Sequence, residues 1–442
     1  MLKFLYVLKR RAPGVVRQHP RRKPLLGGGR SVGAIRPGRA LIVGLGISGM
    51  ATAIRLRGLG WDPVIIERAP ARRTHGYFIA TMGTGQAAAK RLGVLDVLPD
   101  RTPSGDSVMY DIQRNGKTRK SVALFDLPVR PKPMLMLRSD IEQALFSALP
   151  GDVEIRYSTV PTQIVQDPDG VDVLLRDTLA ETSTAARFDL VVGADGLRST
   201  VRSLVFGPHE RYLRPLNYMI GAFAPQESPG GLRNGDGAML FEPGRALIIY
   251  PFADHPPTVL FSYYTPDVDA EFAASPVERV RSVYGPPPYG EILGEMIDGY
   301  AAADTYLFDS VEQVCVDRWH RGRVVLVGDS AWCPTLYSGM GSSTGMAGGE
   351  LLGSVFEQHT GTLEEALTDW ERRLRPYTTS FQNIGARASR AFPPRTRTGL
   401  VLRRALIMGR RSPVIAPVLN SVIRHMPSLS VRSTDIAAAT QG

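Results

Sequence analysis

Arg39-Ala-Leu-Ile-Val-Gly44-Leu-Gly46-Ile-Ser-Gly49 is the stretch of sequence that decides the fold. An apolar strand runs into a glycine turn, and residues 48–59 then follow a helical pattern with small residues on one side. The first glycine permits a tight turn, the second lets the backbone approach a pyrophosphate, and the third lets helix and strand pack closely. Free N–H groups at the helix N-terminus would then face the phosphates.

The acidic residue at the end of the next strand indicates which nucleotide fits. Residues 63–67 are predicted to form that strand, and Glu67 ends it eighteen residues after Gly49. This is the place of the acid that accepts the ribose hydroxyls of a dinucleotide. It fits the free 2′-hydroxyl of FAD or NAD and disfavours the 2′-phosphate of NADP. The motif therefore predicts an FAD or NAD site, with Arg68 beside it; the alternative is a glycine turn that binds no ligand.

Two later segments have the same design, an apolar strand followed by a glycine-containing turn. Residues 190–202 read Leu-Val-Val-Gly-Ala-Asp195-Gly-Leu-Arg198-Ser-Thr-Val-Arg. Residues 323–330 read Arg-Val-Val-Leu-Val-Gly-Asp329-Ser, and residues 338–345 read Ser-Gly339-Met-Gly341-Ser342-Ser-Thr-Gly. Taken alone, each segment could be an ordinary strand and turn. The Gly-x-Ser-x-Gly pattern at residues 341–345 is not read as a hydrolase motif, because no strand runs directly into its serine.

Together, in this order and spacing, the three segments resemble the FAD-dependent monooxygenases of the aromatic-hydroxylase (p-hydroxybenzoate hydroxylase-like) family. The resemblance covers roughly residues 39–434, and the basic helical end of the chain is similar to that of actinobacterial-type members. The cofactor-binding residues that it implies are Gly44, Gly46, Ser48, Gly49, Glu67, Arg68, Arg138, Asp195, Arg198, Asp329, Gly339, Gly341 and Ser342.

The resemblance also implies roles for these residues. Asp195 and Arg198 would organise their segment around the FAD pyrophosphate, and Asp329 would bind the ribityl hydroxyls. Arg138 would lie near the ribityl and phosphate groups. Backbone N–H groups of residues 338–345, at a helix N-terminus, would stabilise the negative charge of reduced flavin.

The reaction that the resemblance implies uses NADPH or NADH as a transient co-substrate. Hydride reduces FAD, dioxygen adds at C4a, and the C4a-hydroperoxyflavin hydroxylates or epoxidises an aromatic, polyketide-like or related small organic substrate. Only one complete dinucleotide fingerprint is present, which favours an enzyme without a separate nicotinamide domain. No catalytic residue is assigned, because the cofactor carries the chemistry.

Two alternatives stay open. One is an FAD-dependent oxidase or reductase that inserts no oxygen. The other is a membrane-surface flavoprotein, suggested by four arginines interleaved with apolar residues in residues 402–414. The chain also departs from the family pattern at Ser330, Trp332, Ser343 and residues 349–350. These departures are expected beside the flavin and therefore bear on the exact reaction.

The predicted fold class is α/β, with a discontinuous Rossmann-like FAD-binding domain, an inserted β-sheet substrate domain and a helical C-terminal region. Within it, residues 84–98 are predicted to form one helix, and Ser139 is predicted to cap the helix over residues 139–149. The predicted domains are a disordered basic arm (1–38), the FAD-binding domain (39–110, 133–205 and 310–358), the substrate domain (111–132 and 206–309), and the helical C-terminal region and tail (359–442).

Charge is concentrated at the two ends of the chain. The 442 residues carry a net charge of +11. Residues 1–40 hold eleven Lys and Arg, and residues 372–434 hold thirteen Arg, with no acid in either stretch. The body between them is acidic, which argues against nucleic acid as a partner. Peripheral membrane contact through the basic termini stays open.

The cysteine and apolar content indicates where the chain works. Two cysteines give neither a disulfide framework nor a metal set, so we expect no metal and a cytoplasmic location, with a membrane-peripheral location as the alternative. No stretch of about 20 apolar residues could span a bilayer. The expected partners are dioxygen and a small organic substrate.

Overall fold

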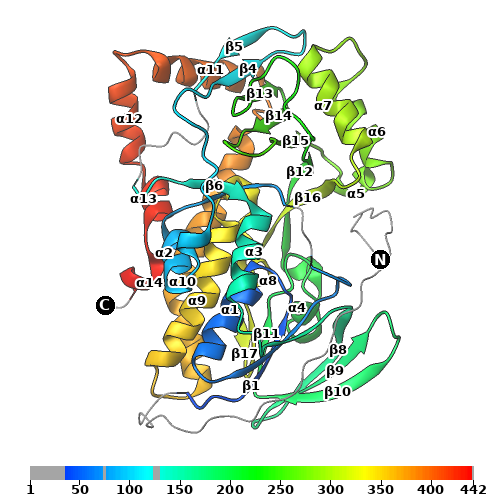
Figure 1. Cartoon of the computed structure of the whole chain (residues 1–442), viewed down its shortest axis with the longest axis vertical. Coiled ribbons are helices and arrows are strands. Elements are labelled where there is room, and N and C mark those ends of the chain that lie inside the picture. The colour runs from blue at the N-terminus through cyan, green and yellow to red at the C-terminus, as the bar shows by residue number, and fades with distance from the viewer. Residues whose placement is uncertain (1–34, 73–75, 123–129, 441–442) are drawn as a thin grey trace.

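The computed structural model describes residues 35–72, 76–122 and 130–440. Most of the arm predicted for residues 1–38 lies outside these described residues. Two large β-sheets stand at opposite ends of the molecule, with a layer of long helices beside the first of them (Figure 1). The predicted α/β class is confirmed; the domain boundaries stay a prediction.

The first sheet is built around the strand that precedes the glycine turn. Its six strands are β17 (His320–Arg321), β18 (Val324–Leu326), β11 (Leu190–Gly193), β1 (Arg39–Val43), β2 (Asp62–Ile66) and β7 (Glu154–Arg156), in that order. All neighbours are parallel except β17 and β18. The three glycine segments therefore end three adjacent strands, β18, β11 and β1, at one edge of the sheet. This edge is where open α/β sheets bind ligands.

Helices pack against this sheet and against one another. They are α1 (Ile47–Gly58), α2 (Gly83–Arg91), α3 (Arg138–Ala148), α4 (Thr200–Val205), α8 (Asp329–Trp332), α9 (Gly341–Gln358) and α10 (Leu363–Ala391). Small residues let α1 and α9 approach closely: a Cβ at Gly349 would stand 2.7 Å from Thr52 Oγ1. The close packing fixes the N-termini of α1 and α9 relative to each other.

The second sheet is mostly antiparallel and has seven strands. In order they are β16 (Leu307–Val314), β12 (Leu213–Phe223), β15 (Thr258–Tyr264), β14 (Arg245–Tyr250), β13 (Gly237–Glu242), β4 (Met109–Ile112) and β5 (Thr118–Lys120). Three helices cover one face: α5 (Val268–Glu271), α6 (Pro276–Tyr284) and α7 (Glu291–Ala302). The other face turns toward the cofactor side of the molecule, where Ile220, Tyr250 and Leu260 form part of a second apolar cluster.

Smaller elements connect these layers. They are the pair β3 (Phe78–Thr81) and β6 (Met134–Leu137), the sheet of β8 (Thr159–Gln166), β9 (Val171–Asp177) and β10 (Ser183–Phe188), and the short helices η1 (Leu95–Val97), η2 (His209–Arg211) and η3 (Leu336–Ser338). The chain ends in α11 (Arg397–Arg411), α12 (Ala416–Arg424), α13 (Pro427–Ser433) and α14 (Ile436–Ala439).

Two local predictions were wrong. Residues 84–98 do not form one helix, because Gly93 adopts a positive φ of 73° that separates α2 from η1. Ser139 is not the N-cap of α3. The helix begins at Arg138, and the Asp140 carboxylate accepts a hydrogen bond from Leu137 N at 2.9 Å. An acid at the third helical position has replaced the expected serine cap.

Candidate cofactor and substrate site

The first glycine turn combines two tightly packed glycines with one that is open. Gly44 has a φ of 110°, and a Cβ there would stand 2.5 Å from Ala194 O. A Cβ at Gly49 would collide with Gly44 O. Gly46, at the N-cap of α1, has no atom within 4 Å of the position that a Cβ would occupy. Gly44 and Gly49 thus shape the turn, while Gly46 leaves its surface free for a ligand.

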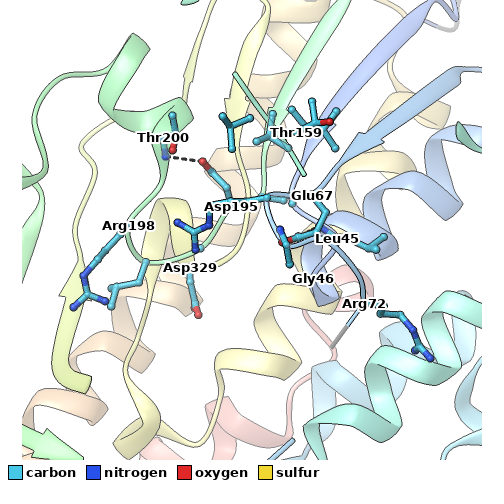
Figure 2. A pocket seen from close by; sticks show the side chains of 18 of the residues that line it. Leu45, Gly46, Glu67, Arg72, Thr159, Asp195, Arg198, Thr200 and Asp329 are labelled. Carbon is cyan, nitrogen blue, oxygen red and sulfur yellow. Dashed lines mark hydrogen bonds between the residues drawn. The ribbon is translucent and has the colours of Figure 1, made fainter. Parts of the chain in front are cut away.

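Glu67 follows β2 and faces the same turn (Figure 2). Its Oε2 accepts a hydrogen bond from Leu45 N at 3.0 Å, and its Oε1 accepts one from Ala69 N at 2.9 Å. The carboxylate therefore holds the glycine turn in place and still lines the cavity beside it. Arg68 lies next to it on the cavity wall.

Asp195 organises the second glycine segment. Its carboxylate accepts hydrogen bonds from Ser199 Oγ at 2.5 Å, from Thr200 N at 2.6 Å and from Val201 N at 3.1 Å. Figure 2 shows the bond to Thr200. Burial raises the pKa of this carboxyl group, and these hydrogen bonds oppose the rise. Asp195 thus fixes the N-terminus of α4 at the cavity wall.

Arg198 links the second segment to the second sheet. Its Nη2 lies 2.8 Å from Asp309 Oδ1 and 3.3 Å from Glu312 Oε1, both on β16. Sequence reasoning assigned Arg198 to the pyrophosphate but did not find these acidic partners. Strand β16 carries no local motif, and only the fold brings it to this place.

The third segment reaches the same cavity at Asp329. Gly328 has a φ of 74° at the N-cap of α8, and Asp329 begins that helix. The Asp329 carboxylate lies deep in the molecule yet faces the open cavity, and its desolvated surroundings raise its pKa. The positive charge of Arg138, which pairs with Glu142 at 3.0 Å, opposes this rise.

Two cavities meet at this position. The first, of about 350 Å³, extends from Glu67 and Arg72 to Asp329. The second, of about 380 Å³, extends from Asp329 toward the second sheet. Gly46, Arg138 and Asp329 line both cavities, which therefore form one elongated channel.

The structure brings together nearly all the candidate residues. Eight line the first cavity: Gly44, Gly46, Glu67, Arg68, Arg138, Asp195, Arg198 and Asp329. Four others line the second: Ser48, Gly339, Gly341 and Ser342. Gly49 lines neither, because it packs against the turn. Three further residues that line the second cavity, Tyr77, Thr258 and Leu307, were missed because no motif marks them in the sequence.

The second cavity is mostly apolar. Phe78, Ile220, Tyr250 and Leu260 contribute to its walls. Among the described residues that line it, the only charged ones are Arg138 and Asp329, which are shared with the first cavity. Its polar groups include the hydroxyls of Thr258 and Thr335, whose Oγ1 atoms are buried without a hydrogen-bond partner. A buried hydroxyl without a partner is costly, so a ligand that satisfies it binds more tightly.

The departures from the family pattern were expected beside the flavin, and this expectation was wrong. Ser330, Trp332, Ser343 and residues 349–350 line neither cavity. Trp332 instead packs against the rings of Trp319 and Trp370, with ring centroids 4.6 and 5.9 Å apart. Glu350 pairs with Arg91 at 2.8 Å. Trp332 and Glu350 thus connect helices, a role that a comparison of motifs could not distinguish from contact with a cofactor.

The channel fits an extended dinucleotide with a flat ring at one end. At one end, Glu67 and the unobstructed surface of Gly46 suit an adenosine and its pyrophosphate. In the middle, Asp329 presents an accessible carboxylate to hydroxyl groups. At the other end, α9 begins at Gly341 beside the apolar cavity, and the first N–H groups of a helix have no partners within it.

Comparison with known proteins agrees with this geometry. Residues 39–212 match the FAD binding domain family. The chain is 25% identical over 357 residues to a flavin-dependent monooxygenase from an unknown prokaryotic organism, covering 80% of this chain and 89% of the relative.

Solved structures share the fold. Tetracycline destructase Tet(55) superposes with a TM-score of 0.69 at 22% identity, covering 84% of this chain and 94% of that one. Klebsiella pneumoniae HpxO, complexed with FAD and uric acid, superposes with a TM-score of 0.67 at 18% identity, covering 89% and 97%.

Fold, channel and matching domain define the class: the chain is an FAD-binding flavoprotein and a monooxygenase. Within that class, it is similar to the FAD-dependent monooxygenases of the aromatic-hydroxylase type, as its three glycine segments predicted. The cofactor predicted from the three glycine segments is thereby confirmed as FAD.

Proposed function

We propose that this enzyme uses NADH or NADPH and dioxygen to insert one oxygen atom into an uncharged, largely apolar organic substrate. An aromatic or polyketide-like compound would be hydroxylated or epoxidised. The observation that carries this proposal is the continuity of the channel. Its cofactor half and its apolar half meet at Gly46, Arg138 and Asp329, which line both.

Different residues along the channel would bind different parts of the cofactor. Glu67 and the open surface of Gly46 bind the adenosine diphosphate part, and Asp329 accepts hydrogen bonds from the ribityl hydroxyls. The N-terminus of α9 presents backbone N–H groups where negative charge develops on a reduced ring. Bound FAD would supply the redox chemistry, taking hydride and activating dioxygen at C4a. The chain contributes position, polarity and exclusion of water.

The substrate class follows from the walls of the second cavity. A carboxylate or phosphate in this half would lie among apolar side chains, with Arg138 as its only cationic neighbour among the described residues. Burying an unpaired charge is strongly unfavourable, so a neutral ring system fits better. The buried hydroxyls of Thr258 and Thr335 would pair with its polar groups. The solved relatives named above act on tetracycline or hold uric acid, which supports a small organic substrate.

The hydride donor has no domain of its own in this proposal. The one dinucleotide fingerprint, in residues 44–49, belongs to the FAD half. NADH or NADPH would therefore approach the flavin transiently, and occupancy of the apolar half would gate that approach. We assign the enzyme to the cytoplasm, where reduced nicotinamides are made. Peripheral membrane contact through its basic ends is compatible with this function, because apolar substrates concentrate in bilayers.

The test compares neutral and charged compounds as matched pairs. NADH and NADPH oxidation is measured with phenols and polyketide-like phenols, each beside its carboxylate analogue. We expect neutral members to accelerate oxidation and carboxylates to leave it slow. Thr258→Val should raise KM for hydroxylated substrates, while Thr258→Ser keeps it and Thr360→Val, at an exposed site before α10, leaves it unchanged. Faster oxidation with the carboxylates would contradict the assigned substrate class.

A further inference from the structure

Helix α11 carries four of its large apolar side chains on the outside of the molecule. Val401 is 65% exposed, Leu402 63%, Leu406 52% and Met408 61%. The half-buried positions of the helix include Leu400, Arg403, Ile407 and Arg410, and Leu400 packs against the apolar cluster of the second sheet. Arg403 stacks over the ring of Phe241 on β13, with its guanidinium carbon 3.6 Å from the ring centroid. Four of the large apolar side chains of this helix are therefore exposed together with arginines, whereas a helix on a globular body usually buries its apolar face.

Helix α12 continues the exposed apolar surface. Val414 is 80% exposed, Val418 64%, Val422 54% and Met426 44%. These four residues are spaced four apart and form one stripe along and beside α12. A Cβ at Gly409 would stand 2.9 Å from Leu419 Cδ1, so the two helices cross closely at that glycine. Figure 1 shows both helices at the outer edge of the molecule. We call residues 397–426 the C-terminal arch.

The sequence around the exposed apolar residues contains many arginines and no acidic residue. Arg397, Arg404 and Arg411 on α11 are exposed. The whole stretch 372–434 carries thirteen Arg and neither Asp nor Glu. Exposed large apolar side chains gathered on two adjoining helices indicate an interaction surface. Its partner must accept apolar groups and positive charge together.

Charge discriminates among the possible partners. A second copy bound face to face would set the arginines of one arch against those of the other. The N-terminal forty residues, with eleven Lys and Arg and no acid, would be repelled in the same way. An anionic lipid surface offers phosphate groups for the arginines and an acyl boundary for the stripe. Among the described residues, no helix is both long and apolar enough to cross a bilayer, so the arch would lie in the interface.

We propose that the C-terminal arch docks this enzyme on anionic lipid bilayers, with the stripe from Val401 to Met426 inserted at the acyl boundary and the arginines at the headgroups. This docking does not rest on the proposed substrate, since it follows from exposure and charge alone. It would place the second sheet, to which Arg403 anchors the arch, next to the bilayer.

The experiment is co-sedimentation of the purified full chain with two kinds of vesicle, phosphatidylcholine alone and phosphatidylcholine with phosphatidylglycerol. We expect binding to the second kind that weakens with added salt. The double variant Leu402→Asn/Leu406→Asn should lower the partition coefficient roughly tenfold, since two exposed leucines lose their burial in lipid. The matched control is Val165→Asn/Leu179→Asn, on the β8–β10 sheet, where both residues are also exposed, at 53% and 81%. FAD content should be unchanged in both variants.

The Leu402→Asn/Leu406→Asn variant decides the outcome. Binding to anionic vesicles by itself is not sufficient, because the basic N-terminal residues could attract such vesicles without the arch. Wild-type binding by the Leu402/Leu406 variant would overturn the proposal, and so would failure of the unmodified chain to bind. Sedimentation equilibrium without vesicles gives the remaining test. A dimer that dissociates on the Leu402/Leu406 substitution would assign the surface to a second copy and reject the membrane.

Discussion

At the residue scale, Gly46 lies where the glycine turn meets both cavities. A substitution there can test cofactor binding without disturbing the fold. A Cβ there meets no protein atom, so Gly46→Ala should fold with nearly normal stability. The added methyl group would enter the space that the pyrophosphate needs, and we expect FAD affinity to fall at least about tenfold, or about 1.4 kcal/mol. The measurement is FAD titration of the apoprotein beside thermal unfolding.

Two other glycines serve as controls for that substitution. Gly58→Ala, at the far end of α1, also meets no atom and should leave FAD binding intact. Gly44→Ala should destabilise the fold itself, because φ is 110° and Ala194 O is in the way. Normal FAD affinity in Gly46→Ala would show that the cofactor does not pass this turn.

Glu67 should matter through both its charge and its size. The carboxylate holds Leu45 N and is proposed to accept the ribose hydroxyls. Hydrogen bonds to charged groups are worth about 1.5–3 kcal/mol, so Glu67→Gln should weaken FAD binding by roughly ten- to a hundredfold. Glu67→Arg should weaken it further, because it adds bulk and positive charge. Equal affinities in the two variants would remove Glu67 from the adenosine site.

Asp329 offers the corresponding test in the middle of the channel. Its carboxylate is accessible from the cavity, so Asp329→Ala should fold normally. Loss of its hydrogen bonds to the ribityl chain should cost about 1.5–3 kcal/mol of FAD binding for each charged bond. Fluorescence titration with FAD measures this loss. Affinity equal to that of the unsubstituted chain would mean that Asp329 does not touch the cofactor.

At this scale, the sequence could predict the residues that belong to motifs and little else. Glycines and acids at the ends of strands are recognised by their spacing in the sequence. Twelve of the thirteen candidates predicted in this way line the channel. Thr258 and Asp309 come from strands of the second sheet, and only tertiary packing brings them to the cavity. Trp332 shows the opposite error, since adjacency to Asp329 in the chain did not place its ring beside the flavin site.

At the scale of elements, the tryptophan cluster of Trp319, Trp332 and Trp370 holds α8, α10 and the end of the first sheet together. Trp332 is 1% exposed, and a Cβ at Gly348 of α9 would stand 2.7 Å from its ring. Trp332→Ala should therefore lower the free energy of unfolding by about 3–5 kcal/mol through the cavity it leaves.

Urea unfolding measures that loss, and Trp332→Phe should recover part of it. The regioselectivity of oxygen insertion should be the same in both variants, because Trp332 lines neither cavity. Unchanged stability together with a shifted product would place the ring beside the flavin and contradict the structure.

The ends of helices were predicted less well from sequence patterns than the presence of the helices. The apolar positions in residues 84–98 suit one helix, yet a single glycine with positive φ ends α2 before η1. At α3, an aspartate at the third position caps the helix in place of Ser139. Each feature depends on the local conformation of one or two residues. The periodicity of the apolar residues carries no information about that conformation. The presence of an inserted β-sheet could be predicted, because its strands within residues 238–264 are apolar and separated by clear turns.

At the scale of the whole molecule, the fold class could be predicted because three short motifs had to converge on one sheet edge. Strands β1, β11 and β18 are neighbours in the sheet although the chain separates β1 and β18 by more than half its length. The exposure of the apolar residues Val401, Leu402, Leu406 and Met408 of α11 could not be predicted. The sequence shows only that apolar residues and arginines alternate, and the fold decides which of them faces outward.

The most direct measurement follows oxygen itself through turnover. The enzyme, loaded with FAD, is supplied with NADH or NADPH, a neutral phenolic substrate that accelerates their oxidation, and isotopically labelled dioxygen. Mass spectrometry then reads the label in the product. The channel that joins the cofactor half to the apolar cavity predicts one labelled oxygen atom in each product molecule. Product formed without label, or formed equally well without oxygen, would contradict oxygen insertion and identify an oxidase or reductase instead.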